Sequence, residues 1–573
     1  MAVLATLALL AAPAGAQPDR PLGDARLDAL AARYFDDAWR LDPVDATDAG
    51  LHDQDDKLGS FSADAYAERL AVARHYLSEL KAIDPTTMGA DASYDAQIFE
   101  SKPEERILTL GTLESWKHRP ELYTDTASDG VYSLLARDFA PLGDRVRSLV
   151  ARERQLPAML AQAQANVTSV DAVRAVIARQ DIEGAIDFFS RVVPLGVAPL
   201  RDARVRAEFV TVNAAAIAAL RAYLAALEAG PFAHPSGSFA IGRDRFAELL
   251  RLQELTPIPL ETYESVGEDA LEKTKADFVA TARAIDPTKT PLAVAAELRE
   301  KHPAADALLR TAADDVVALR QFVVAHHIVT LPPDDDVAVV PTPEFERATS
   351  FASMDAPGPL EKHATRAYYN VTPVEPGWSA ERKEQHLGFF NDYAFPLISA
   401  HEVMPGHYLN FALDAHEKLS LIRRLMGSAS FSEGWAHYDE QMMVDEGWGN
   451  GDPRVRLAQL SLALQRECRY LVGLREHTEG MTVEAATAFF EDNAFMAGEP
   501  ARREALRGTV DPLYGYYTLG RLEILKLRED FRKASSAHYS LQTFHDEFLA
   551  HGDPPIAIVR KIVLGADDDG KLL

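Results

Sequence analysis

Two histidines and a glutamate lie within seven residues of one another in the segment 395–410, which reads FPLISAHEVMPGHYLN. His401 and Glu402 directly follow an apolar run, and His407 comes six residues after His401. Burying an imidazole beside a carboxylate is costly unless a partner compensates for the lost hydration. A metal ion is such a partner, so the segment predicts a metal site.

The spacing of the two histidines differs from the usual zinc-peptidase motif H-E-x-x-H, in which positions i and i+4 share one helical face. His401 and His407 would diverge by about 120° on a regular helix. Pro405 and Gly406 lie between them, and these residues break or distort helices. We therefore expect a two-residue bulge that brings His407 to the place where the i+4 ligand normally lies.

A catalytic zinc ion needs a third protein ligand and an open position. The segment 431–438, FSEGWAHY, offers Glu433, which follows His407 by 26 residues. Glu433, His437 and Glu440 share one stripe of a predicted helix, which is either a solvated polar face or an inward face that supplies the ligand. His437 is either an accessory ligand or a partner of a ligand. The single cysteine, Cys468, leaves histidine and glutamate as the credible zinc ligands.

The pair of segments HEVMPGH and SEGWAHY resembles the bacterial domain of unknown function 885 family. Members of that family carry an H-E-x-x-P-G-H segment and a downstream E-G-W-A-x-Y segment. The resemblance implies a mainly helical, gluzincin-like zinc metallopeptidase with a deep cleft. It also implies that His401, His407 and Glu433 bind Zn²⁺ and that Glu402 is the catalytic general base.

Further residues resemble the family's downstream patterns. The letters YTLG that begin at Tyr517 resemble its Y-x-x-G, and Arg469 with His477 matches its R…H pattern. An oxyanion needs a donor besides zinc, and Tyr517, Tyr516 and His477 are the candidates in that order, with packed aromatics as the alternative for the tyrosines. Arg469 or Arg475 either binds a substrate carboxylate or forms an ion pair.

We therefore expect a hydrolase that cleaves peptide bonds with a metal-activated water and Glu402 as general base. One alternative is a non-catalytic, metal-containing helical binding protein, although a structural metal site does not require an adjacent general base. Another is a metal-dependent hydrolase that acts on a non-peptide amide. A di-iron carboxylate protein would need two E-x-x-H segments, and a serine hydrolase would need a G-x-S-x-G elbow.

The elements that position these residues are predicted to be mainly α-helical. Helical periodicity runs from about 24 to 327, with caps at Ser62 and Thr290, and returns from 381. The segment 331–378 predicts two short strands, at 337–340 and 367–371, which would form a small β-hairpin or short sheet before the metal-binding helix. The second strand offers an edge for an extended peptide. We expect a large zincin-like body in which 17–330 forms one wall of the cleft and 331–573 holds the metal, the two being one structural unit.

Composition excludes several partners. The 573 residues include 59 Lys and Arg and 87 Asp and Glu, which gives a net charge of −28. That charge repels phosphate and argues against nucleic acid, and a cationic or neutral peptide would approach more readily than an acidic one. Nothing in the sequence indicates an oligomeric state.

The first residues predict export. Residues 1–16, MAVLATLALLAAPAGA, combine an apolar core with a small-x-small cleavage site, which is typical of a signal peptide. The run is too short to span a bilayer, and we expect no transmembrane segment elsewhere. A lone cysteine cannot form an internal disulfide. These features favour a periplasmic protein of a Gram-negative bacterium, or a secreted one.

Overall fold

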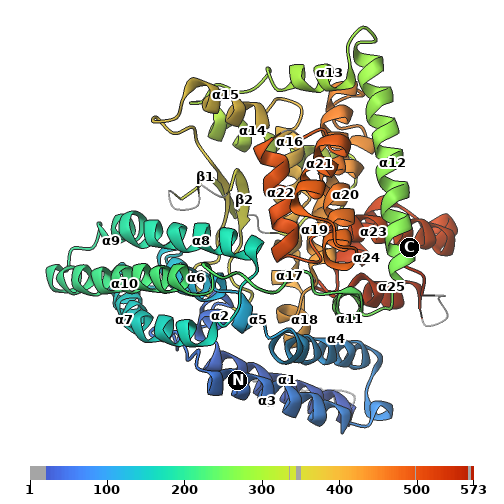
Figure 1. Ribbon diagram of the computed structural model, residues 1–573. Coiled ribbons are helices and arrows are strands. Elements are labelled where there is room, and N and C mark those ends of the chain that lie inside the picture. The colour runs from blue at the N-terminus through green and yellow to red at the C-terminus, as the bar shows by residue number, and fades with distance from the viewer. Residues whose placement is uncertain (1–20, 334–335, 344–346, 348–349, 497, 566–569) are drawn as a thin grey trace, which may run out of the picture.

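The computed structural model describes residues 21–333, 336–343, 347, 350–496, 498–565 and 570–573, so the predicted signal peptide lies outside the described residues. The protein is mainly helical, as expected, with one small sheet (Figure 1). The first part of the chain forms α1 (Leu22–Leu41), α2 (Pro43–Asp48), α3 (Ala63–Lys81), α4 (Ala90–Ile107), α5 (Ser115–His118), α6 (Glu121–Ala136), α7 (Leu142–Asn166), α8 (Ala172–Asp187), α9 (Val193–Val197) and α10 (Ala203–Ala229).

The rest of the chain packs beside these helices (Figure 1). Its helices are α11 (Arg243–Glu254), α12 (Leu260–Ile285), α13 (Pro291–Leu298), α14 (Leu308–Ala325), α15 (Ala380–Phe389), α16 (Phe395–Glu402), α17 (His407–His416), α18 (Leu421–Leu425), α19 (Ala429–Asp445), α20 (Pro453–Thr478), α21 (Val483–Asn493), α22 (Glu499–Val510), α23 (Tyr516–Ser535), α24 (Leu541–Leu549) and α25 (Ile556–Leu564).

The two helix starts predicted from capping residues are confirmed. The Ser62 hydroxyl accepts a hydrogen bond from the Ala65 N–H at the start of α3. The Thr290 hydroxyl does the same for the Ala293 N–H at the start of α13, where proline occupies the first helical position. Both are side-chain caps of the kind that satisfy an otherwise unpaired N–H.

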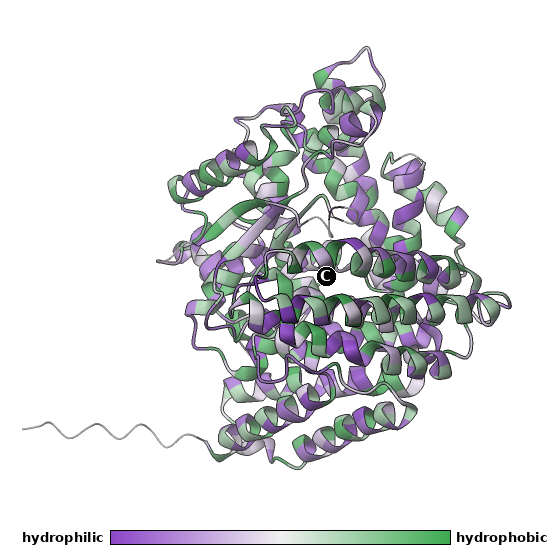
Figure 2. Ribbon diagram, turned by 90° about the vertical axis from the view of Figure 1, so that its left-hand side faces the viewer, coloured by the Kyte–Doolittle hydropathy of each residue, from purple (hydrophilic) through white to green (hydrophobic). Residues whose placement is uncertain are grey.

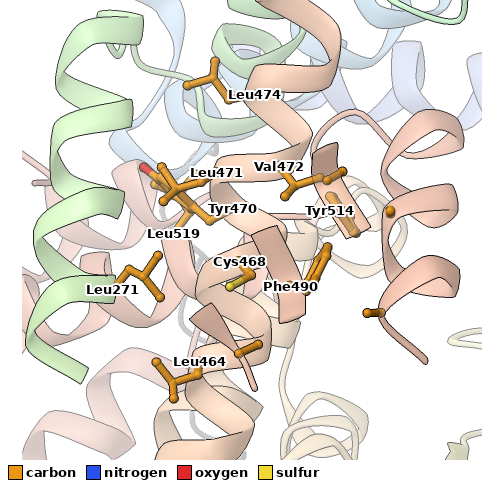
Figure 3. Packing of buried hydrophobic residues seen from close by; sticks show 14 of the residues in the cluster. Leu271, Leu464, Cys468, Tyr470, Leu471, Val472, Leu474, Phe490, Tyr514 and Leu519 are labelled. Atoms are coloured by element: carbon orange, nitrogen blue, oxygen red, sulfur yellow. The ribbon is translucent and has the colours of Figure 1, made fainter. Parts of the chain in front are cut away.

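Three of the apolar cores contain residues from both sides of residue 330. One core belongs to the helices between α2 and α10, whereas α11 to α13 share a core with α20 to α22. Another joins α1, α3 and α4 to α18 and α25, far apart in the sequence. Figure 3 shows the α12–α20 part of these cores, in which Cys468 lies among Leu464, Tyr470 and Phe490. Cys468 is a buried free thiol.

One described helix, α10, is long and apolar enough to cross a membrane by length and composition alone. This is weak evidence, because core helices of soluble proteins share these properties. Phe209, Leu220 and Tyr223 of α10 are buried in the core that it forms with α7 and α8. Figure 2 shows hydrophobic and hydrophilic residues interleaved along the helices, as expected of helices with one buried face.

The sheet has three strands, β1 (Val337–Pro341), β2 (Ala352–Asp355) and β3 (Ala367–Val371), in the order β1-β3-β2. The expected short sheet is therefore present, with one additional strand, β2. The two predicted strands pair in parallel and do not form a hairpin, while β2 pairs antiparallel with β3. Because β3 is paired on both sides, it cannot offer an edge to a peptide as we expected. The two outer strands, β1 and β2, are each paired on one side only among the described strands, and of these β2 lies beside α16.

Candidate metal centre

The helix that carries the first histidine is interrupted before the second. α16 ends at Glu402 and α17 begins at His407. The Gly406 N–H donates to the Ala400 carbonyl, 2.9 Å away, across six residues instead of the usual four. A Cβ on Gly406 would lie 1.9 Å from the His401 carbonyl oxygen, so only glycine fits here. The two-residue bulge predicted from Pro405 and Gly406 is therefore observed.

The bulge makes the two imidazoles converge on one carboxylate. His401 Nε2 and His407 Nε2 each lie 3.5 Å from Glu433 Oε2, and the two rings are perpendicular with centroids 4.9 Å apart. Among the described residues, these three side chains form the group of potential metal ligands whose ligand atoms all lie within 4.8 Å of one another.

The donor set fits a metal ion. Glu433 Oε2 is buried and has no hydrogen-bond partner among the described residues. Ligand atoms bound at 2.0–2.1 Å in a tetrahedral zinc site are about 3.3–3.4 Å from one another, close to the separations found here. The side chains of His407 and Glu433 are 19% and 26% exposed, so solvent reaches the group.

The outer nitrogen of His401 is held by a buried acid. His401 Nδ1 lies 2.8 Å from Glu440 Oε1, and Arg466 pairs with the same oxygen at 3.0 Å. A histidine held in this way presents Nε2 to a metal. His437 does not join the ligand group: its Nδ1 contacts Glu440 Oε2 at 3.3 Å, and burial lowers the pKa of His437 to about 3.

The acids also control the charge of the histidines. Burial alone would lower the pKa of His401, but the neighbouring carboxylates of Glu433 and Glu440 raise it to about 10. Burial would raise the pKa of Glu433, but the close His401 and His407 rings hold it well below its usual range. Since a metal binds neutral imidazole, metal binding would release a proton from this cluster.

Glu402 lies beside the ligand group and contacts the edge strand. Its Oε2 accepts a hydrogen bond from the Met354 N–H of β2, 2.8 Å away. Burial raises the pKa of Glu402, and positive charge on His401 and His407 acts in the opposite direction. A carboxylate whose pKa is raised towards neutrality is suited to accepting and returning a proton.

The helices α19 and α23 cross closely beside the ligand group. A Cβ on Gly434 of α19 would lie 2.5 Å from the Cα of Gly520 in α23, and a Cβ on Gly520 would lie 1.8 Å from the Ser430 carbonyl oxygen. Only glycines allow the two helices to approach this closely. The crossing places the Tyr517 hydroxyl 3.2 Å from Glu433 Oε1, to which it donates a hydrogen bond.

The other two oxyanion candidates point elsewhere. The Tyr516 hydroxyl donates to Asp511 Oδ2 at 3.2 Å. His477 Nε2 donates to the Gly508 carbonyl at 2.9 Å, and its Nδ1 accepts from the Ile241 N–H at 3.3 Å. Both ring nitrogens of His477 are thus used by backbone groups, and burial lowers its pKa to about 4. The structure gives this residue a packing role and does not bring it to the cluster.

The two arginines singled out in the sequence are ion-paired. Arg469 binds Glu504 through two nitrogens at 2.7 and 2.8 Å. Arg475 binds Glu264 at 2.9 Å and also pairs with Glu268. Neither guanidinium therefore offers a free fork to a substrate.

With the geometry established, comparison with known proteins gives the family. The sequence profile of a bacterial protein of unknown function (DUF885) matches residues 43–563. The chain belongs to this family. Comparison with curated proteins finds no match.

Solved structures resemble this DUF885 protein over nearly its whole length. A candidate lipoprotein of unknown function from Shewanella oneidensis is 26% identical, with a TM-score of 0.80, covering 94% of this chain and 99% of the other. A candidate lipoprotein from Colwellia psychrerythraea is 17% identical, also with a TM-score of 0.80, covering 95% and 99%. The second likeness shows the fold alone.

Sequence reasoning placed Glu440 on the same helical stripe as Glu433 but did not predict that it holds His401. It also missed the other partners that support the site. Arg466 and Met354 had no such signal, because their contacts are made only by tertiary packing.

Proposed function

We propose that this DUF885 protein is a zinc-dependent metallopeptidase. The observation that supports it most is the convergence of His401 Nε2 and His407 Nε2 at 3.5 Å from the unpartnered Glu433 Oε2. Three ligands of this type with solvent access match a catalytic zinc site better than a closed structural one.

The residues have distinct roles in this proposal. His401, His407 and Glu433 would hold the ion. When bound, zinc would supply a positive charge that polarises a carbonyl group and lowers the pKa of water towards neutrality. Glu402 accepts a proton from the attacking water and passes it to the leaving amine. Tyr517, whose hydroxyl is already within the cluster, turns to donate to the oxyanion.

Two features favour peptide hydrolysis over the alternatives. A metal kept only for structure would not need Glu402 beside it. An extended peptide can pair with the edge strand β2 through its backbone. A small non-peptide amide has no backbone that could pair in this way. Met354 on that strand contacts Glu402, so a peptide aligned there would run past the general base.

Export belongs to the proposal as well. The segment 1–16 has the composition of a signal peptide. The similar protein from Shewanella oneidensis is described as a candidate lipoprotein, and lipoproteins are exported. We therefore propose that the enzyme is exported, to the periplasm or outside the cell.

The test is the substitution Glu402→Gln, assayed for zinc content and for hydrolysis of a mixed peptide library. We expect about one zinc per chain in both proteins and a loss of hydrolysis of about 100- to 10,000-fold, because the general base is removed. Glu417→Gln is the matched control, since His416-Glu417 is a His-Glu pair outside the cluster and Glu417 is exposed. Full hydrolysis by the Glu402 variant, or unmutated protein without metal, would contradict the proposal.

A further inference from the structure

Three guanidinium groups surround the aromatic ring of Tyr517. The central carbons of Arg466, Arg469 and Arg507 lie 5.6, 5.1 and 5.8 Å from its centroid. The hydroxyl of the same tyrosine binds the predicted metal ligand Glu433. The net charge of the protein is −28, but three arginines gather beside its candidate metal centre.

Two of these arginines already have carboxylate partners, and the third does not. Arg466 pairs with Glu440, and Arg469 pairs with Glu504. In the described part of the chain, no carboxylate oxygen lies within ion-pair distance of Arg507. Its hydrogen bonds go to two phenol oxygens, those of Tyr516 at 3.2 Å and Tyr517 at 3.5 Å.

The unused donors of Arg507 reach solvent. Both of its hydrogen bonds come from Nη2, which leaves Nε and Nη1 without a partner among the described residues. Neither atom is one of the buried polar atoms that lack a partner. The Tyr516 hydroxyl, which accepts from Arg507, donates in turn to Asp511 Oδ2. Nε and Nη1 each carry an N–H that can donate a charge-assisted hydrogen bond to a carboxylate oxygen.

The position of these donors matches one group of a peptide. Arg507 is two hydrogen bonds, of 3.5 and 3.2 Å, from the metal ligand Glu433. In a peptide cleaved before its last residue, the terminal carboxylate carbon is three covalent bonds beyond the scissile carbonyl carbon, at most about 4 Å away. A carbonyl at the ligand group would thus place a free terminal carboxylate near Arg507.

We infer that Arg507 binds the free C-terminal carboxylate of the substrate, so that the protein removes residues from peptide C-termini. This inference rests on the proposed peptidase function and names its substrate class. In each turnover the water oxygen bonds to the scissile carbonyl carbon, the C–N bond breaks, and the proton passes to the amine. The products are one free amino acid and a peptide shortened by one residue.

A binding measurement tests the role of Arg507 without depending on hydrolysis. The probes are acetyl-trialanine and its C-terminal amide, which differ only in the terminal charge, titrated into the Glu402→Gln protein supplied with equimolar zinc. We expect the acid to bind at least tenfold more tightly, as charge-assisted hydrogen bonds predict. Adding Arg507→Gln should abolish that preference, and Arg507→Lys should keep only part of it, because lysine keeps the charge but lacks the planar set of N–H donors.

Arg502→Gln, on an exposed position of the same helix α22, is the matched control and should keep the full preference. Circular dichroism and zinc content verify that each variant is folded. Equal binding of acid and amide, or a preference that survives Arg507→Gln, overturns the inference.

Hydrolysis by the unmutated protein then distinguishes the two proposals. Cleavage of both probes with the same kcat/KM would overturn the carboxylate assignment while the peptidase function stands. Preferential binding of the acid without cleavage of any peptide would support the role of Arg507 and overturn the peptidase function.

Discussion

In the described part of the chain, His401 and His52 each lie between two carboxylates, and of these two only His401 belongs to a candidate metal centre. His401 lies between Glu440 and Glu433. His52, in the loop after α2, lies between Asp55 and Glu361, which precedes β3. The residue types are nearly the same, so the difference between the two sites must come from geometry.

The distances separate the two sites. His52 contacts its acids at 3.1 and 3.0 Å, which are direct hydrogen bonds. His401 makes one such bond, to Glu440, but its Nε2 is 3.5 Å from Glu433, and His407 Nε2 is equally far from the same oxygen. At His52 the histidine forms ion pairs with both acids, and we call His52 with Asp55 and Glu361 the clamp. At His401 a second imidazole, that of His407, joins the group at the spacing of metal ligands.

The largest expected effect comes from removing a ligand at one site and its counterpart at the other. His407→Ala should weaken zinc binding more than a hundredfold, because loss of a direct ligand costs more than loss of an outer partner. His52→Ala should leave zinc affinity within twofold. Competition with a chromogenic chelator measures the zinc affinity of both variants. An equal loss of zinc affinity in the two would contradict the assignment of the metal centre to His407 and not to His52.

A smaller effect is expected from the acids that hold the Nδ1 atoms. Glu440→Gln should weaken zinc binding about 10- to 100-fold, the usual range for an outer partner of a ligating histidine. Asp55→Asn removes the equivalent contact of His52 and should not change zinc affinity. An unchanged affinity in the Glu440 variant would show that Glu440 does not orient His401.

The smallest effect concerns pH and stability at the clamp. Burial lowers the pKa of His52, but hydrogen bonds with Asp55 and Glu361 outweigh it and raise the pKa. The charged clamp therefore stabilises the fold fully below the unfolded-state pKa of about 6.5 and loses this contribution as pH rises through the folded-state value. His52→Gln should lower Tm by about 1 °C more at pH 6 than at pH 9, if the clamp contributes about 1 kcal/mol.

Differential scanning calorimetry at the two pH values measures this difference. His75→Gln is the control, because His75 pairs with Glu79 on an exposed surface, where such a pair contributes little to stability. A larger loss at pH 9 than at pH 6 would contradict the direction of the pKa shift at His52.

Local chemistry made much of this site predictable. The helix break follows from Pro405 and Gly406, which act on their own backbone, and the ligand types follow from His401 and Glu433. The helical character and several caps are local in the same way. These features need no knowledge of the rest of the chain.

What escaped prediction depends on contacts between distant segments. β2 reads ASMD, which is only four residues long and has no β-branched or aromatic residue, and it forms because β3 is beside it. The parallel pairing of β1 with β3 is likewise set by tertiary packing. His477 matches the family's R…H pattern and was expected to donate to the oxyanion. Its ring is instead held by the Gly508 carbonyl and the Ile241 N–H, which sequence alone could not show.

The crossing of α19 and α23 has a mechanical consequence. Gly434 and Gly520 bring backbone against backbone, so no flexible side chain separates Glu433 from Tyr517 at this point. The two helices should therefore move as one rigid frame, and any opening or closing around a substrate must bend the chain elsewhere. A single methyl group at either glycine would act as a wedge whose displacement is transmitted directly to the candidate metal centre.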